Sequence, residues 1–183
     1  MKKKEAWRRA VEAHAALLAN APERLDHLLD LLQGRASLGA RLAREPKEKL
    51  ATLANRKALG ELTRLAVSRL ENCAKDWPTV PTYHEILCRR RNQLGLLSAG
   101  EGNWAEAEKQ YRLGLDVALK LEADFAKSPG VGGYSGPLFD NLACLYIKSP
   151  KHRDPAKALA CAQEAVKRNP NEPAFQCTLA DAC

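Results

Sequence analysis

The sequence predicts an all-α protein built from helical hairpin repeats, with an N-terminal helical segment that packs on the repeats or caps them. Alanine, leucine, arginine and glutamate, all good helix formers, dominate the 183 residues, and aromatic residues make up 5%. Apolar residues recur every three to four positions, as on one face of a helix. A tight turn at 100–103 joins two such stretches, and a second pair follows at 137–170. Because one hairpin cannot bury its own apolar face, we expect the pairs to stack.

The turn between the first two stretches is specified by its residues. Gly100 and Gly102 are expected to supply the positive φ angles of a short reversal. Asn103 can cap the second helix, with Glu106 three positions later. The small residue Gly95 is expected to let the two helices approach closely.

A pattern of small and large residues recurs along the second half of the chain. The matching positions are Leu94, Gly95, Gly102, Trp104, Ala107 and Tyr111, then Phe139, Leu142, Ala143, Tyr146, Ala158, Ala162 and Pro170, then Gln176, Leu179 and Ala180. This pattern resembles the tetratricopeptide repeat, although Arg91 stands in place of its first aromatic residue and Ser98 in place of its tyrosine. The copies are 48 and 37 residues apart, against a family period of about 34, so we infer insertions. The resemblance implies stacked hairpins whose first helices line a groove for a partner.

We divide the chain into an N-terminal helical segment (1–76), a linker with two prolines (77–81) and the repeats (82–183). In the N-terminal segment we expect helices over 4–19 and 23–33, a short piece at 37–44 and a long helix from Pro46 to about Lys75. The repeats are expected to begin at a capping box formed by Thr82 and Glu85. Their predicted ranges are 82–126, 137–170 and a partial 171–183, with a Gly/Pro-rich loop at 127–137.

Several classes of function find no support in the sequence. The six cysteines stand singly, with no histidine at ligand spacing, so we predict no metal site and no disulfide framework. The four histidines are scattered and no nucleophile or phosphate-loop motif occurs, so we expect neither an enzyme nor a bound cofactor. No long apolar stretch indicates membrane insertion or secretion, and we predict a cytoplasmic protein.

The positive charge is concentrated in the first half of the chain. Residues 1–81 contain 16 Lys and Arg against 10 Asp and Glu, whereas residues 82–183 contain 13 against 12. A basic helical surface can bind nucleic acid, and it can also simply keep a protein in solution. Within the run Arg89-Arg90-Arg91, successive side chains should fan out around a helix, so that one or two at most share a direction.

The sequence therefore predicts a non-catalytic module that binds a partner protein or peptide in the groove of the repeats. By helical spacing and by the resemblance, the groove residues are Arg89, Asn92, Gln93, Leu96, Asp140, Asn141, Cys144 and Lys148. One branch of the family holds a peptide's terminal carboxylate with two lysines, two asparagines and an arginine. Only Asn141 matches that set, so we expect no such clamp. Two alternatives remain open: a nucleic-acid-associated protein that uses residues 1–81, and an accessory region of a larger signalling enzyme.

Overall fold

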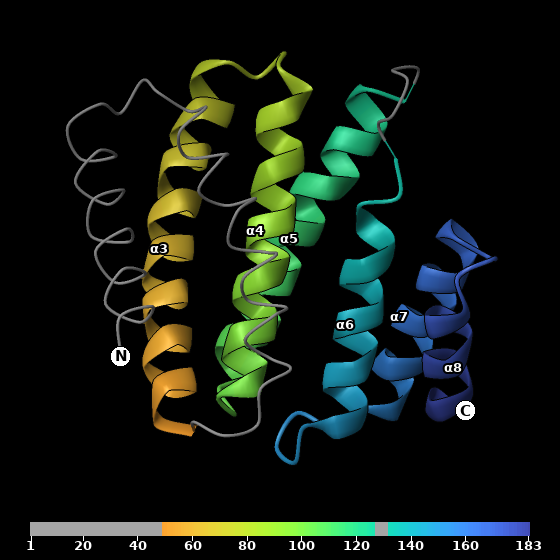
Figure 1. The fold of residues 1–183 in the computed structure, drawn as a ribbon. Coiled ribbons are helices and arrows are strands. Elements are labelled where there is room, and N and C mark those ends of the chain that lie inside the picture. The colour runs from red at the N-terminus through yellow and green to blue at the C-terminus, as the bar shows by residue number, and fades with distance from the viewer. Residues whose placement is uncertain (1–48, 127–131) are drawn as a thin grey trace. The chain divides into compact units, whose positions relative to one another are not determined.

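A computed structural model describes residues 49–126 and 132–183 (Figure 1). These ranges are all-helical and contain no strand. The helices are α3 (Lys49–Asp76), α4 (Pro81–Gly100), α5 (Trp104–Asp124), α6 (Ser135–Lys148), α7 (Pro155–Arg168) and α8 (Pro173–Ala182). None of them combines the length and hydropathy needed to cross a bilayer.

The chain divides into two compact units, Met1–Leu62 and Thr63–Cys183. The helices predicted at 4–19 and 23–33, the piece at 37–44 and the start of the long helix at Pro46 lie outside the described residues. The described part of the long helix is α3, and its second half belongs to the same unit as α4–α8. The candidate site lies entirely in this second unit.

The second unit contains two antiparallel hairpins that pack in series. Helix α4 pairs with α5, and α6 pairs with α7 (Figure 1). The second helix of each hairpin then packs on the first helix that follows it, α5 on α6 and α7 on α8. The first helices also touch directly, α4 with α6 and α6 with α8. This recurring order of contacts makes the fold repeat-like.

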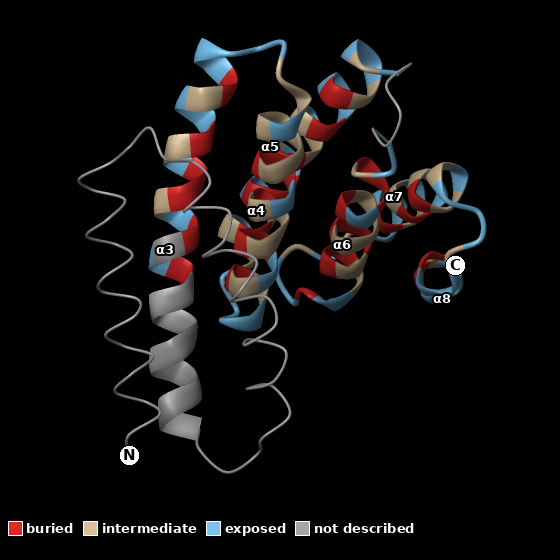
Figure 2. Ribbon diagram, turned by 45° about the horizontal axis from the view of Figure 1, so that its top comes forward, coloured by how far each residue is buried: buried red, intermediate tan, exposed pale blue. Residues whose placement is uncertain are grey.

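Small residues lie where the helices approach most closely. Ala107, Ala118, Ala143 and Ala162 are fully buried, and Figure 2 shows such buried positions on the sides of the helices that face their neighbours. A side chain at Gly95 would meet the ring of Tyr111, which confirms the close approach predicted within the first hairpin. The helices therefore pack through alanine and glycine positions that keep the backbones close.

The predicted ends of the helices are only partly right. Asn103 and Asp154 cap α5 and α7, each accepting a hydrogen bond from the backbone N–H three residues later, at 3.3 and 3.1 Å. Gly102 has a φ of 76°, as predicted, but Gly100 does not have a positive φ. Helix α4 continues to Gly100, so one left-handed residue is enough to reverse the chain.

Two other expected boundaries are wrong. The capping box of Thr82 and Glu85 is absent, because α4 begins at Pro81 and its N-cap, Val80, makes no side-chain hydrogen bond. Proline has the φ of a first helical residue and no N–H that would need a cap, which explains the earlier start. The loop predicted at 127–137 ends sooner than expected, since α6 begins at Ser135 and Pro137 lies in its first turn.

The connections before α4 and before α8 have the same backbone structure. Each has prolines at its second and fifth residues, Trp77 to Pro81 in one and Asn169 to Pro173 in the other. Three backbone hydrogen bonds recur with the same spacing, at 2.9, 3.2 and 3.3 Å before α4 and at 3.1, 3.3 and 3.1 Å before α8. Helix α3 therefore leads into α4 as α7 leads into α8, and the recurring structure begins before residue 82.

Candidate partner-binding surface

The residues predicted for the groove lie on the first helices, α4 and α6. Arg89, Leu96 and Lys148 are exposed, whereas the other five, Asn92, Gln93, Asp140, Asn141 and Cys144, are half-buried. The half-buried ones are covered in part by neighbouring helices, since four of them, all but Gln93, contact a residue of another helix. These contacts decide which of the eight side chains share a site.

An amide pair joins α4 to α6. Asn141 Nδ2 donates to Asn92 Oδ1 at 2.8 Å, across 49 positions of sequence. Each side chain keeps one further polar group, the Asn92 amide N–H₂ and the Asn141 carbonyl oxygen. The pair therefore fixes the two first helices side by side and still offers a donor and an acceptor to a ligand.

A matching contact joins α6 to α8. The Thr178 hydroxyl lies next to Asp140 and 3.7 Å from the Cys144 sulfur, and it also donates to the Ala174 carbonyl at 3.1 Å. Asp140 follows Asn92 by 48 residues and Thr178 follows Asn141 by 37, the same intervals that separate the copies in the sequence. The same two positions thus meet at both junctions between first helices.

A pocket of about 300 Å³ opens beside the amide pair. Its wall is formed by α4 and by the approach to and first turn of α6, and its lining residues are Cys88, Arg89, Asn92, Gly132, Gly133, Tyr134, Pro137 and Leu138. Leu138 and Cys88 are almost fully buried and form its apolar part. The Cys88 thiol donates to the Glu85 carbonyl at 3.1 Å, so its polar group is satisfied within α4.

Arg89 and Tyr134 lie together at this pocket. The guanidinium carbon lies 5.0 Å from the centre of the tyrosine ring, and Arg89 Nη2 donates to the Tyr134 hydroxyl at 3.3 Å. Glu85, one turn before Arg89 on α4, lies near the same hydroxyl and helps to raise the pKa of Tyr134, although burial is the larger cause. Sequence reasoning missed Tyr134. It lies 45 positions from Arg89, in a glycine-rich stretch with no helical periodicity, and no local signal indicates the contact.

The three successive arginines point in different directions, as predicted. Arg91 is almost fully buried, donates to Gln110 Oε1 at 2.8 Å and pairs with Glu71. Arg90 Nη1 donates to Gln93 Oε1 at 2.8 Å along the same helix. Of the three, Arg89 alone lines the pocket.

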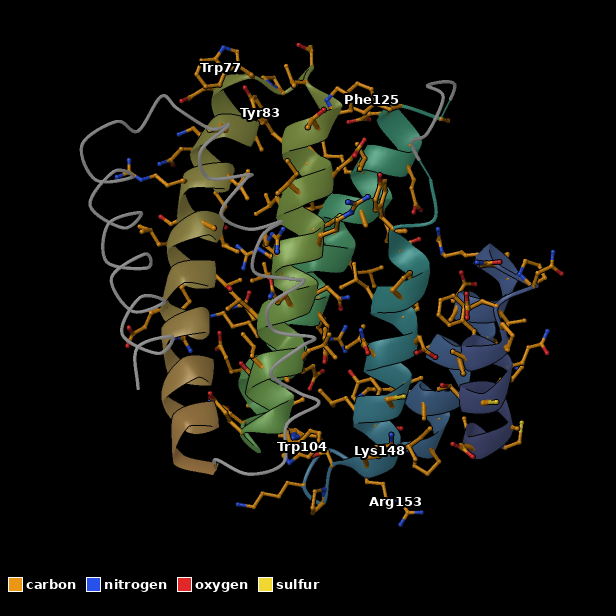
Figure 3. All side chains as sticks on the ribbon, in the orientation of Figure 1. Trp77, Tyr83, Trp104, Phe125, Lys148 and Arg153 are labelled. Carbon is orange, nitrogen blue, oxygen red and sulfur yellow. The ribbon has the colours of Figure 1, made fainter. Side chains whose placement is uncertain are left out.

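The structure does not gather all eight predicted residues. Lys148 lies at the last residue of α6, near Arg153, whereas the pocket is at the first turn of that helix (Figure 3). Lys148 follows Pro137 by eleven positions, a rise of about 16 Å at 1.5 Å per residue. Leu96 lies two turns beyond Arg89 on α4 and is 50% exposed. Arg89, Asn92 and Asn141 therefore form one group, and Asp140 and Cys144 another beside α8.

Burial raises the pKa of the Asp140 carboxyl above its ordinary value, although the Thr178 hydroxyl and Lys148 act in the opposite direction. The Oδ1 atom is shielded from solvent and has no hydrogen-bond partner. A carboxyl with a raised pKa binds its proton more tightly in the folded state. Its effect on stability is therefore most favourable at low pH, and it weakens as the pH rises through the folded-state pKa.

We expect Asp140→Asn to raise the free energy of unfolding at pH 7 by about 0.5 to 1 kcal/mol, because the amide removes a poorly solvated charge. At pH 3.5 the gain should shrink, since the aspartic acid is then largely protonated. Urea titrations at both pH values measure the difference, and the exposed Asp116→Asn serves as the control. A gain that is equal at both pH values would contradict this account.

The described residues contain no group of three or more His, Cys, Asp or Glu side chains placed to hold a metal ion. All six cysteines, which lie within the described ranges, have free thiols. The pocket itself combines hydrogen-bonding groups, the Arg89 cation and an apolar recess.

Comparison with known proteins adds little. No protein-family model matches the chain, and no curated protein does. Among solved structures, the crystal structure of BtubC (BKLC) from P. vanneervenii aligns over 99% of this chain and 82% of its own, with 16% sequence identity and a TM-score of 0.46. A likeness of this size is too slight to assign a family, a function or a partner.

Proposed function

We propose that this protein is a non-catalytic binding module of the tetratricopeptide type, which holds a peptide or protein partner along the outer face of α4 and α6. The observation that best supports this proposal is the pocket of about 300 Å³ beside the Asn92–Asn141 pair. Pockets that hold ligand groups combine an apolar recess with a few placed polar groups. Here the recess is formed by Leu138 and Cys88, and the polar groups belong to Arg89 and Asn92.

The recurring architecture also supports a binding surface of this kind. Contacts at equivalent positions join α4 to α6 and α6 to α8, so the first helices lie next to one another in series and present polar side chains at repeated positions. An extended peptide needs polar groups at regular intervals to receive its backbone. Cytoplasmic localisation is part of the proposal, and the six free thiols support it because disulfides are rare in reducing compartments.

The test is selection of peptides from a random display library against the full chain, followed by calorimetry. We expect the double variant Asn92→Ala, Asn141→Ala to bind a selected peptide at least tenfold more weakly, since each hydrogen bond lost to a desolvated partner costs about 1 to 3 kcal/mol. Because the two amides bond to each other, the double variant should also lose about 1 kcal/mol of stability. Lys109→Ala, an exposed change on α5, serves as the control.

Two outcomes would argue against this function. One is a library that yields no peptide. The other is a selected peptide whose affinity is unchanged in the double variant but falls when Lys2, Lys3 and Lys4 are neutralised. The second result, together with a steep dependence on salt, would favour the nucleic-acid alternative, which rests on residues 1–81. Of these, residues 1–48 lie outside the described ranges.

A further inference from the structure

We propose that the pocket formed by Arg89, Asn92, Tyr134 and Leu138 receives an acidic side chain of the partner, together with an apolar side chain next to it. This inference rests on the proposed function, since it names the kind of peptide that the same surface would select. It follows from the charge of the pocket, the donors that remain available in it and its apolar recess.

The charge of the pocket favours an anion. Arg89 is the charged residue among those that line it. A guanidinium has five N–H donors, and Arg89 directs one nitrogen, Nη2, to the Tyr134 hydroxyl. The ring of Tyr134 lies under the guanidinium and holds it in place, since the two centres are 5.0 Å apart. An arginine fixed in this way can donate to a carboxylate with little further loss of side-chain freedom.

A second donor lies next to Arg89 on the same face of α4. The Asn92 amide accepts from Asn141 through its oxygen, so its N–H₂ group remains for a ligand. Arg89 and Asn92 are three residues apart, which makes them neighbours on the helix surface. A carboxylate between them would accept hydrogen bonds from both, and the charge-assisted bond to Arg89 would be the stronger.

The apolar part of the pocket accounts for the second half of the proposal. Leu138, which is 1% exposed, and Pro137 both line this recess. A volume of about 300 Å³ is at the lower end of the range for ligand pockets, enough for one or two side chains. An acidic residue beside an apolar one matches this arrangement, whereas a phosphate or a strongly hydrated sugar leaves the recess unfilled.

Glu85 opposes an acidic ligand and offers an independent test. Its carboxylate lies near the Tyr134 hydroxyl, one turn from Arg89, and it would repel an incoming carboxylate. Replacing it with glutamine removes that repulsion and keeps the side chain's length. The proposal therefore predicts one substitution that weakens binding of an acidic peptide and another that strengthens it.

The probes are two capped heptapeptides, Gly-Ser-Leu-Glu-Leu-Ser-Gly and the same peptide with glutamine at its centre, titrated into the ¹⁵N-labelled full chain at 150 mM salt. We expect the acidic peptide to shift the resonances of Arg89, Asn92 and Tyr134 and to bind about tenfold more tightly than its neutral counterpart. Arg89→Met should abolish this preference, and Glu85→Gln should increase it about threefold. Arg153→Met, an exposed arginine at the other end of α6, should change nothing.

The outcomes distinguish selection of an acidic side chain from peptide binding as such. Equal binding of the two peptides at this face, or a preference that survives in Arg89→Met, overturns the acidic selection and leaves peptide binding intact. The carboxylate could also come from the end of a peptide chain. A third probe, with neutral side chains and a free terminal carboxylate, tests that source. If it binds better than the acidic heptapeptide, the assignment to a side chain is wrong. If neither heptapeptide shifts these resonances and the display library yields no peptide, both proposals fail.

Discussion

Gly95→Leu is expected to destabilise the protein by more than about 3 kcal/mol, because the new side chain has no space between α4 and α5. A β-carbon at this position would lie 2.3 Å from Tyr111 Cε1 and 2.4 Å from Cδ1, well inside contact distance. The tyrosine is 2% exposed and is surrounded by core residues, so its ring has little room to move. A leucine adds three more carbons at the same point, and the two helices would have to separate.

The substitution Gly95→Ala tests the same packing through the sign of its effect on stability. Alanine normally stabilises a helix interior over glycine, by about 0.5 to 1 kcal/mol. At Gly95 the clash should reverse that gain into a loss of about 1 to 3 kcal/mol. Gly100→Ala, in the last turn of the same helix, meets no atom within 4 Å and should be neutral or slightly stabilising. Thermal and urea unfolding measure all three variants, and an unchanged melting temperature for Gly95→Leu would contradict the observed packing.

Glu122→Ala is expected to cost about 3 kcal/mol, because this carboxylate holds three helices together. It lies on α5 and accepts from the Ser135 backbone N–H at 2.9 Å, at the start of α6. The Ser135 hydroxyl reaches both of its oxygens, at 2.9 and 2.8 Å. Arg168 Nη1, at the end of α7, donates to it at 2.7 Å. Alanine would leave the fully buried Ser135 and a largely covered arginine without these partners.

A second glutamate beside the same arginine provides the matched control. Glu164 on α7 forms ion pairs with Lys167 and Arg168, at 3.4 and 3.8 Å, and its side chain is 39% exposed. Exposed pairs of this kind contribute little, so Glu164→Ala should change the free energy of unfolding by less than about 0.5 kcal/mol. Similar losses in the two variants would mean that the Glu122 contacts do not stabilise the junction. Glu122→Gln, which keeps one oxygen, should fall between them.

Local features of the chain were sufficient to predict its described helices. The periodic apolar residues and the cap at Asn103 act within one or two turns, and Gly95 acts between two helices that a short turn joins. The structure has the cap and the close approach as expected. The errors at Thr82 and Gly100 have the same local origin. Either Pro81 or Thr82 could begin the helix, and either Gly100 or Gly102 could adopt the positive φ of the turn. The sequence does not show that Pro81 and Gly102 are the residues used.

The candidate site could be predicted only in part, since its contacts join distant segments. Helical spacing placed Arg89, Asn92 and Asn141 on outer faces, but it could not show that the two amides bond to each other or that Tyr134 lies against Arg89. Those contacts depend on the offset between α4 and α6, which the packing of α5 against both helices determines. Lys148 is the last residue of α6, and helical spacing could not show that the pocket forms at the first turn of that helix. The resemblance to the repeat family predicted which residues lie on the outer faces of the first helices. The three-dimensional packing was needed to find the pocket.

The burial of Cys88 has a consequence for its reactivity. Burial raises the pKa of this thiol to about 12, so almost none of it is thiolate at neutral pH, and the thiolate is the form that alkylating reagents attack. Cys177 and Cys183 are exposed and should be modified first. Cys88 should become modified only when α4 and α6 separate, and its rate of alkylation would then report the free energy of that local opening. Cys88 also lines the pocket in which a partner would bind. A bound partner should therefore slow the opening and with it the alkylation of Cys88.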